Sequence, residues 1–231
     1  MRNILIIPAR GGSIGIPDKN LYELRNQSLV YRAVRASLAS ELGEVIVSSD
    51  SKRILMEGEI AGASRLIKRP DELANSKSKT IETIVHVLSI IEYDPDFIFI
   101  VQPTTPLRQV SDLIDSYKIM RMKPDAISLA SITKQEEPHP YKMFTKTQEY
   151  LKPLIRIDNV ENPRQELDNI YRLNGGVYIL KTEAIEQKRV ISDYTTYYEM
   201  PPQRSINIDT PWDLVLLEAL LSKSDVELFD Y

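Results

Sequence analysis

Hydrophobic and polar positions follow two different periods along this chain. Short unbroken apolar runs at 4–7, 45–47 and 97–101 are typical of strands that are buried on both faces. Between them, apolar residues recur at helical spacing and predict helices over 28–38, 51–61, 80–93 and 110–121. Regular alternation of strand and helix favours right-handed parallel crossovers, so we expect an α/β fold with a Rossmann-like, doubly wound, mostly parallel sheet.

The C-terminal half continues this pattern with one interruption in a strand and one well-marked helix. Strands are predicted over 126–132 and 171–180, and the second contains the run Asn174-Gly175-Gly176, which is typical of a bulge or of a close approach to a ligand. The last helix, to about residue 221, has Thr210 as N-cap, Pro211 at its first position and Asp213 closing a capping box.

Residues 134–170 interrupt the alternation with a polar, irregular stretch. Four prolines, at positions 138, 140, 153 and 163, punctuate it. A segment of this length inside a compact domain is more often functional than a simple connection. We therefore predict one domain over 1–231 with an insertion over 134–170.

Composition narrows the possible functions. The 231 residues include 29 Lys and Arg against 33 Asp and Glu, a net charge of −4, so we expect no nucleic-acid binding. A protein of this charge that handles anions must concentrate positive charge in its cleft. The chain has no cysteine, which excludes disulfides and thiolate chemistry, and no apolar run approaches the ~20 residues of a membrane span. We expect a cytoplasmic protein with no membrane partner.

The loop after the first strand carries the clearest chemical signal. The chain breaks at Pro8 into a segment with three glycines, the cations Arg10 and Lys19, and the hydroxyl of Ser13. Glycines 11 and 12 allow positive φ and close approach, and successive backbone N–H groups form an anion-binding concavity. These features suit a polyphosphate, although glycine also serves plain turn geometry. Neither a Walker A element nor a dinucleotide fingerprint is present, which disfavours an oxidoreductase that uses NAD.

Other polar residues follow the later strands, at the same edge of the expected sheet. Asp50 is either a group that faces the cleft or the N-cap of the next helix, and we favour the cap. Pro103 and Pro106 fix φ in the loop that contains Gln102 and Thr104, so these side chains point in set directions. Tyr197 and Tyr198 form either an apolar wall of a pocket or alternating positions of a strand.

Several of these segments, in this order, resemble the motifs of the cytidylyltransferases that activate nonulosonic (sialic-type) acids. They are the segments 7–13 with 15–17 and 19–20, 68–74, 102–108, 138–142, 162–167, 171–178 and 207–211. The resemblance implies a nucleotide-diphospho-sugar transferase fold, transfer of CMP from CTP to the sugar acid, Mg²⁺ as cofactor, and a homodimer in which the insertion contacts the second subunit and contributes to the sugar pocket.

The resemblance also implies roles for individual residues. Those that would bind the nucleotide are Ala9, Arg10, Gly11, Gly12, Ser13, Lys19, Asn20 and Arg69. Those that would bind the sugar are Gln102, Thr104, Lys142, Arg164, Gln165, Tyr171, Asn174 and Tyr178, with Arg164 and Lys142 suited to its carboxylate. The residues that would act in catalysis are Arg10, Lys19, Gln102 and Asp209. Asp209 would also hold the Mg²⁺ ion.

Three positions depart from the family pattern. Ile14 stands where relatives carry lysine, Ser76 replaces an acidic residue, and Asn207 replaces the first acid of an Asp-x-Asp-Thr-Pro element. An amide oxygen can still ligate Mg²⁺ but brings no charge. The same chemistry on Kdo is one alternative, against which the Gln102 loop argues, because Kdo enzymes carry an acidic loop there. A CTP-binding paralogue with weakened catalysis is another. The sequence does not say which nonulosonic acid is used.

Overall fold

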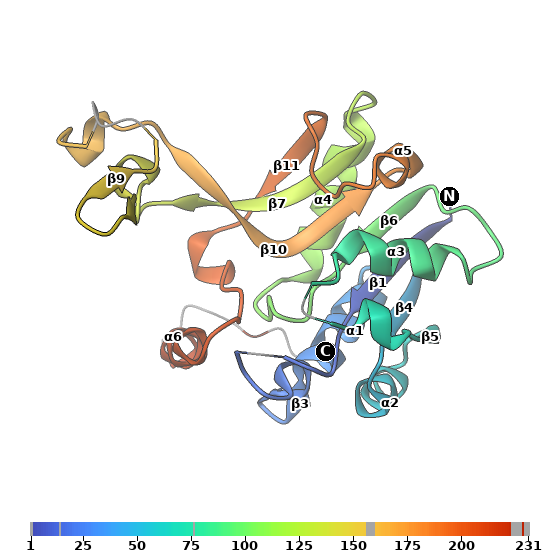
Figure 1. Cartoon of the computed structure of the whole chain (residues 1–231). Helices are drawn as coiled ribbons and strands as arrows, with labels where there is room; N and C mark the ends of the chain where they lie inside the picture. The colour runs from blue at the N-terminus through green and yellow to red at the C-terminus, as the bar shows by residue number, and fades with distance from the viewer. Residues whose placement is uncertain (1, 14, 76, 156–159, 223–227, 229–231) are drawn as a thin grey trace.

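A seven-stranded sheet forms the centre of the computed structural model, which describes residues 2–13, 15–75, 77–155, 160–222 and 228 (Figure 1). The strand order is β11-β7-β10-β6-β1-β4-β5. The strands are β1 (Asn3–Pro8), β4 (Glu44–Ser49), β5 (Arg65–Lys68), β6 (Phe97–Ile100), β7 (Ser128–Gln135), β10 (Ile170–Leu180) and β11 (Thr195–Glu199). Only β10 runs antiparallel to its neighbours in this sheet. The predicted mostly parallel α/β fold is confirmed.

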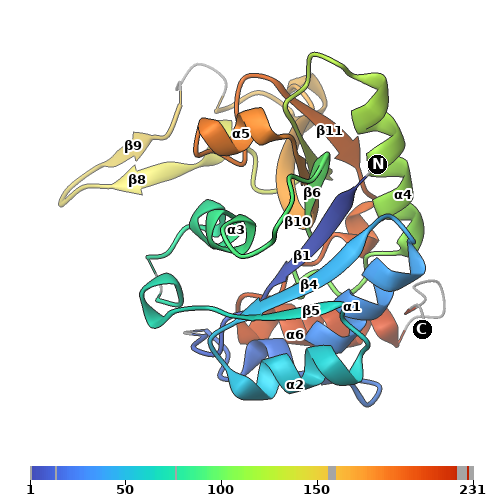
Figure 2. The ribbon, with the colours of Figure 1, turned by 90° about the vertical axis from the view of Figure 1, so that its right-hand side faces the viewer.

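Helices cover both faces of the sheet, because successive side chains of each central strand point to opposite sides. In β1, Leu5 and Ile7 pack in one apolar cluster and Ile4 and Ile6 in another. The first cluster joins α1 (Leu29–Ala39), α2 (Lys52–Ile60) and α4 (Val110–Met122). The second joins α3 (Thr80–Leu88) and α5 (Thr182–Glu186) on the opposite face. Figure 2 shows the sheet between these two layers.

The apolar periodicity located the long elements but missed the short ones. Strand β5 was not expected, because a run of four residues with few apolar positions carries a weak signal. Helix α3 ends at Leu88, five residues before the predicted end, because Ser89 caps it with an N–H bond to the carbonyl of Val85. Ile91 is nevertheless buried, which explains why the apolar pattern ran on. Tyr197 and Tyr198 are strand residues of β11.

Strand β10 contains the predicted irregularity. Its register against β7 shifts between Leu173 and Tyr178, and Gly175 within the shift has φ of +73°. A residue with a Cβ rarely adopts this conformation, so glycine allows the strand to bend here.

Beyond the sheet, β7 and β10 continue as a two-stranded ribbon that carries a small tip (Figures 1 and 2). The tip contains β8 (Phe144–Lys146), β9 (Leu151–Pro153) and the 3₁₀ turns η3 (Pro140–Lys142) and η4 (Arg164–Glu166). We call residues 134–170 the arm. This arm occupies the predicted insertion and projects away from the helices, although the sequence analysis expected no regular strands within it.

A third apolar cluster holds the C-terminal helix α6 (Pro211–Leu221) beside the sheet edge. Ile208 and Leu217 pack there with Ile16, Leu29 and Leu107. The predicted capping box is confirmed, since Oδ2 of Asp213 accepts the backbone N–H of Thr210 at 2.6 Å. The remaining short elements are β2 (Glu23–Leu24), β3 (Gln27–Ser28), η1 (Lys19–Leu21), η2 (Asp71–Leu73) and η5 (Pro202–Arg204). Within the described part of the chain, no helix is both long and apolar enough to cross a membrane.

Candidate active site

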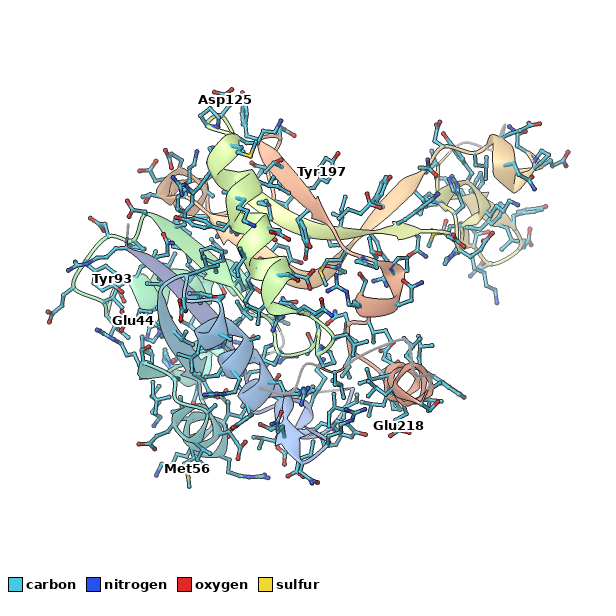
Figure 3. All side chains as sticks on the ribbon, turned by 180° about the vertical axis from the view of Figure 1, so that it is seen from behind. Glu44, Met56, Tyr93, Asp125, Tyr197 and Glu218 are labelled. Atoms are coloured by element: carbon cyan, nitrogen blue, oxygen red, sulfur yellow. The ribbon has the colours of Figure 1, made fainter. Side chains whose placement is uncertain are left out.

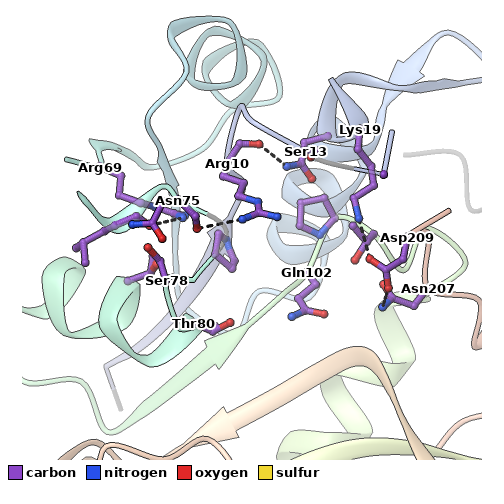
Figure 4. Close-up of a pocket in the computed structure, with 17 residues that line it drawn as sticks. Arg10, Ser13, Lys19, Arg69, Asn75, Ser78, Thr80, Gln102, Asn207 and Asp209 are labelled. Carbon is purple, nitrogen blue, oxygen red and sulfur yellow. Dashed lines mark hydrogen bonds and ion pairs between the residues drawn. The ribbon is translucent and has the colours of Figure 1, made fainter. Parts of the chain in front are cut away.

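A cavity of about 390 Å³ opens at the carboxyl ends of β1, β5 and β6, where ligands bind in open α/β sheets (Figure 4). Segments from distant parts of the sequence meet around it. Its lining residues include Arg10, Ser13, Gly15, Lys19, Asn20, Arg69, Leu73, Asn75, Ser78, Thr80, Thr83, Gln102, Pro103, Thr104, Asn207 and Asp209. Eight residues that the sequence analysis selected therefore share one cavity, namely Arg10, Ser13, Lys19, Asn20, Arg69, Gln102, Thr104 and Asp209.

Two hydrogen bonds hold the loop after β1 in place. The amide of Asn20 donates to the carbonyl of Arg10 at 2.9 Å, which closes the loop on itself. The Arg10 guanidinium reaches across the cavity and donates to the carbonyl of Asn75 at 3.0 Å (Figure 4). A guanidinium held only by a carbonyl retains donors for a phosphate. Ile14 and Ser76, two of the departures from the family pattern, lie outside the described residues.

Asp50 holds this loop and does not cap α2, so the favoured prediction was wrong. The N-cap of α2 is Ser51, and Oδ1 of Asp50 accepts the backbone N–H of Gly11 at 2.9 Å. A Cβ on Gly11 would lie 3.0 Å from Cβ of Ser51, so glycine at position 11 allows the loop to approach the start of α2 closely. Ala9, Gly11 and Gly12 do not line the cavity. Gly11 contributes through the shape of the loop, because its amide is already bonded.

Arg69 forms part of the cavity wall from a buried position. Its Nη2 donates to the carbonyl of Ser48 at 2.8 Å, and its Nη1 lies 3.5 Å from the carbonyl of Leu73. Burial lowers the pKa of Arg69 from its usual value, the nearby carboxylate of Asp50 opposes this shift, and the charge of Arg10 adds to it. Arg69 therefore joins β4 to the loop after β5 and contributes fixed positive charge to the wall.

On the other side of the cavity, Lys19 and Asp209 form an ion pair with Nζ 2.8 Å from Oδ1. Lys19 also donates to the carbonyl of Ile208 at 2.7 Å, and Nδ2 of Asn207 donates to Oδ2 of Asp209 at 2.9 Å. From below, the capping carboxylate of Asp213 accepts the backbone N–H of Asp209 at 2.9 Å. The Asp209 side chain is 63% exposed, so it keeps oxygen lone pairs that face solvent.

Gln102 approaches the strand bulge at the centre of the cavity floor. A Cβ on Gly175 would lie 2.5 Å from Oε1 of Gln102, so this side chain keeps its present position only beside a glycine and its amide would have to shift for a larger residue. Behind it, Nη1 of the buried Arg108 donates to the carbonyls of Gln102 and Gly176, both at 3.0 Å. The bulge and the loop after β6 are therefore fixed to one another.

The lining is cationic and has the donor set for one hard cation. Arg10, Lys19 and Arg69 face a single carboxylate, Asp209, among the described lining residues. Within that part of the chain, no group of three or more Asp, Glu or His side chains could enclose a metal. Among the residues that the structure describes, Oδ1 of Asn207 is a buried acceptor without a hydrogen-bond partner. One carboxylate and one free amide oxygen fit Mg²⁺, which usually takes few protein ligands and completes its shell with water and phosphate.

Six residues predicted to bind the sugar do not line the cavity of the single chain. Lys142 and Gln165 lie on the arm, as does the backbone of Arg164, whose side chain is outside the description, and Tyr171 lies just beyond the arm in β10. Asn174 is fully buried, and its Oδ1 accepts from Ser131 at 2.5 Å. Tyr178 packs in the second apolar cluster, where burial raises its pKa. The side chains of Asn174 and Tyr178 point into the packed interior of the protein and not into the cavity, because the bulge and the register of β10 set their directions.

One wall of the cavity was not predicted from the sequence. This wall contains Asn75, Ser78, Thr80 and Thr83. Thr80 and Thr83 are three residues apart in the first turn of α3 and therefore share a face of that helix. The available signal was a polar pair at this spacing on the same face as the buried Ile84 and Val87, where apolar residues are expected.

Comparisons with known proteins agree with this geometry. A family model described as Cytidylyltransferase matches residues 4–199. The chain belongs to the cytidylyltransferase family. One relative, the CMP-N,N'-diacetyllegionaminic acid synthase of Legionella pneumophila, is 31% identical over 96% of this chain and 97% of its own length. The N-acylneuraminate cytidylyltransferase of Escherichia coli O18:K1:H7 is 29% identical over 98% of this chain, which spans only 54% of that relative.

Two solved structures share the fold of this chain although their sequences are only distantly similar to it. A CMP:2-keto-3-deoxy-manno-octonic acid synthetase complexed with CTP matches with a TM-score of 0.70 at 17% identity, over 96% of this chain and 99% of the other. The 4-diphosphocytidyl-2C-methyl-D-erythritol synthase of Anaerococcus prevotii matches with a TM-score of 0.66 at 10% identity, over 96% of each chain. At these identities the likeness concerns the fold alone.

Proposed function

We propose that this cytidylyltransferase transfers CMP from CTP to a nonulosonic acid and releases pyrophosphate. The observation that carries the proposal is that the Arg10 loop and Asp209 line one cationic cavity. The named relatives, a legionaminic acid synthase and N-acylneuraminate cytidylyltransferases, support the class of sugar acid.

In this proposal the nucleotide lies across the cavity from the α3 wall to Lys19. Arg10, Ser13 and Asn20 hold the triphosphate with charge and hydrogen-bond donors. The polar wall formed by Asn75, Ser78, Thr80 and Thr83, together with Arg69, supplies partners for the edge of cytosine.

The reaction is a substitution at the α-phosphorus of CTP. A hydroxyl of the sugar acid forms the new O–P bond and gives up its proton, while the bond from the α-phosphorus to the bridging oxygen of pyrophosphate breaks. Gln102, fixed against Gly175, orients the attacking hydroxyl. Arg10 and Lys19 stabilise the charge that develops on the phosphate oxygens. No protein nucleophile is required.

Asp209 and the free amide oxygen of Asn207 would hold Mg²⁺ at the edge of the cavity. The ion supplies Lewis-acid stabilisation of phosphate oxygens. Lys19 orients the carboxylate of Asp209 through their ion pair.

We further propose a homodimer in which the arm of one copy approaches the cavity of the other. Lys142 and the Arg164 position lie on the arm, so a second copy is one way to bring them to a sugar carboxylate. Apolar side chains are uncovered on both surfaces. They are Tyr150, Leu151, Leu154 and Ile155 on the arm and Trp212, Val215 and Leu216 on α6.

The test is pyrophosphate release from CTP with a panel of sugar acids. The panel contains N-acetylneuraminic, N,N'-diacetyllegionaminic, pseudaminic and Kdo acids, each with and without Mg²⁺. We expect turnover with one of the first three acids and none without the ion. Turnover with Kdo alone would replace the substrate class. CTP binding without turnover on any acid would identify a binding paralogue, for which the neutral Asn207 is the structural reason.

Two variants with a matched control link this activity to the cavity. Arg10→Ala and Asp209→Ala should each abolish most of the turnover. Arg53→Ala is the control, because Arg53 forms an exposed ion pair with Asp18 at 2.7 Å and neither residue lines the cavity. Full activity of both cavity variants would overturn the assignment.

A further inference from the structure

A buried carboxylate outside the cavity joins the two segments that would position the metal and the sugar. Asp112, in the first turn of α4, is fully buried. Its Oδ2 accepts from the guanidinium of Arg204 and from the backbone N–H of Gln109, the latter at 2.7 Å. Its Oδ1 accepts the hydroxyl of Tyr198 at 2.9 Å. The carboxylate thus has partners from three separate parts of the chain.

Arg204 links this carboxylate to the segment that carries Asp209. It is the last residue of η5, and the chain then runs directly through Ser205 to Asn207 and Asp209 at the cavity. The backbone of this segment is also tied to the loop after β6, because the N–H of Ile208 donates to the carbonyl of Thr104 at 2.8 Å. A shift of Arg204 would therefore move the segment that holds the proposed metal ligands.

Gln109 links the same carboxylate to the loop that carries Gln102. It is the N-cap of α4, and Asp112 accepts its backbone N–H as the third helical residue does in a capping box. The preceding residue, Arg108, donates to the carbonyl of Gln102 at 3.0 Å. The start of α4 and the Gln102 loop are thus one hydrogen-bonded unit.

A second buried connection runs through Asn174. Its Nδ2 donates to Oγ of Ser205 at 2.9 Å, and its carbonyl accepts from Oγ1 of Thr105 at 3.1 Å. This bonding explains why a residue predicted to touch the sugar is turned inward. It also means that Ser205 is held on one side by the bulge of β10 and, through Arg204, on the other side by α4.

We propose that Asp112 and Arg204 are positioning residues, which hold the segment of Asn207 and Asp209 in register with Gln102. This inference rests on the proposed function. A buried ion pair contributes little net stability compared with apolar residues of similar volume, because desolvation offsets the attraction. Its value here is geometric, because a carboxylate with three bonded partners fixes directions that apolar packing leaves free.

The decisive experiment separates geometry from stability. Arg204→Met and the double variant D112L/R204M remove the ion pair, and Arg204→Lys keeps the charge. We expect the double variant to unfold at a lower urea concentration than the wild type but to be folded in the assay, because the Tyr198 hydroxyl and the Gln109 N–H lose their acceptor. Its kcat should fall about 10- to 100-fold and the Mg²⁺ concentration for half-maximal activity should rise. The KM for CTP should change less than kcat, because Arg10 and Arg69 are held by the carbonyls of Asn75 and Ser48, outside this network. Arg204→Lys should recover part of the kcat.

A control variant and two measurements that do not depend on turnover complete the experiment. Arg53→Met removes an arginine from an exposed ion pair and is the matched control, with wild-type kinetics expected. Binding of Mn²⁺ and amide hydrogen exchange over residues 205–209 report on the segment without turnover. If the wild type shows no turnover, the proposed function fails, whereas faster exchange and weaker Mn²⁺ binding in the double variant would still support the positioning role. Wild-type kcat, Mn²⁺ affinity and exchange in a folded double variant would overturn it.

Discussion

The ammonium of Lys19 lies 2.8 Å from a carboxylate oxygen of Asp209, 190 residues further along the chain. Lys19 is largely buried, with 14% of its side chain exposed, whereas Asp209 is mostly open to solvent. This pair joins the loop after the first strand to the segment before the last helix. It places a cation and a candidate metal ligand at one edge of the cavity.

The Lys19–Asp209 pair leads to a prediction about metal dependence. Lys19→Met should leave the fold intact but reduce kcat, because the phosphate loses a cation and Asp209 loses its oriented partner. Asp209→Asn should raise the Mg²⁺ concentration needed for half-maximal activity, because a neutral amide binds the ion more weakly. Pyrophosphate release measured across a Mg²⁺ titration gives both quantities.

Asp18→Asn is the control for that pair, because it removes an ion pair of similar length to Arg53 at the surface. We expect its titration curve to overlay the wild-type curve. If Asp209→Asn also overlays it, Asp209 does not hold the metal.

Gly175 provides a prediction about the position of Gln102. In Gly175→Ala, the new Cβ would lie 2.5 Å from Oε1 of Gln102 in a backbone with φ of +73°. The strained φ should lower the free energy of unfolding by about 1–2 kcal/mol. The displaced amide should lower kcat more than it raises the KM for CTP, as steady-state kinetics can show.

The double variant Q102A/G175A separates the two effects. It keeps the strained backbone but removes the clash, so the stability that it regains relative to Gly175→Ala measures the cost of the clash, and the remaining loss measures the strain. If Gly175→Ala retains full kcat, then Gln102 does not orient the sugar hydroxyl.

The sequence was sufficient for the parts of the fold that depend on local apolar patterning. The helix over Pro211–Leu221 and the strand over Glu44–Ser49 carry such patterns, and both lie where predicted. Strands such as β5 were missed because their pairing with a neighbour, here Ile67 beside Ser48, depends on contacts distant in sequence. The arm was expected as an irregular insertion, because its strands are exposed and lack an apolar face.

The candidate site was predictable where a motif lies in a loop at the carboxyl end of a strand. Arg10, Gln102 and Asp209 each follow this rule and meet in one cavity. Asp50 and Asn174 were misjudged because their roles are set by hydrogen bonds to Gly11 and Ser205, which are 39 and 31 residues away. Residue type alone does not distinguish a polar side chain that faces a ligand from one that holds a backbone in place.

Asp213 gives a prediction about pH. Burial is the largest single effect and raises its pKa, but hydrogen bonds from the backbone of Asp209 and Thr210 and from the Thr210 hydroxyl, with the charge of Lys19, together outweigh it and lower the pKa below its usual 3.8. Because the folded pKa is lowered, the stabilisation by Asp213 is fully present above the unfolded pKa and is lost as the pH falls through the folded value. Urea unfolding of wild type and Asp213→Asn should differ by about 1 kcal/mol at neutral pH.

That difference should shrink below about pH 4, where the wild-type carboxylate takes up a proton. Asp115→Asn is the comparison, because Asp115 forms an exposed ion pair with Lys118 within α4. It should change stability by only a few tenths of a kcal/mol. A difference for Asp213→Asn that is constant from pH 7 to pH 3 would show that its charge is irrelevant to the cap.

The arm yields a prediction about assembly. Tyr150 and Leu151 at its tip are 74% and 66% exposed. Neighbouring large apolar side chains are seldom this exposed in a folded protein unless they belong to an interaction surface. If they pack against a second copy, the double variant Y150E/L151E should sediment as a monomer while the wild type sediments as a dimer. The monomer should retain CTP affinity, because the cavity is built within one chain, but its KM for the sugar acid should rise.

Met56→Glu is the control, because Met56 is 59% exposed on α2, away from the arm, and its substitution should leave the dimer unchanged (Figure 3). A wild-type chain that sediments as a monomer yet turns over the sugar acid would show that the arm is not needed in trans.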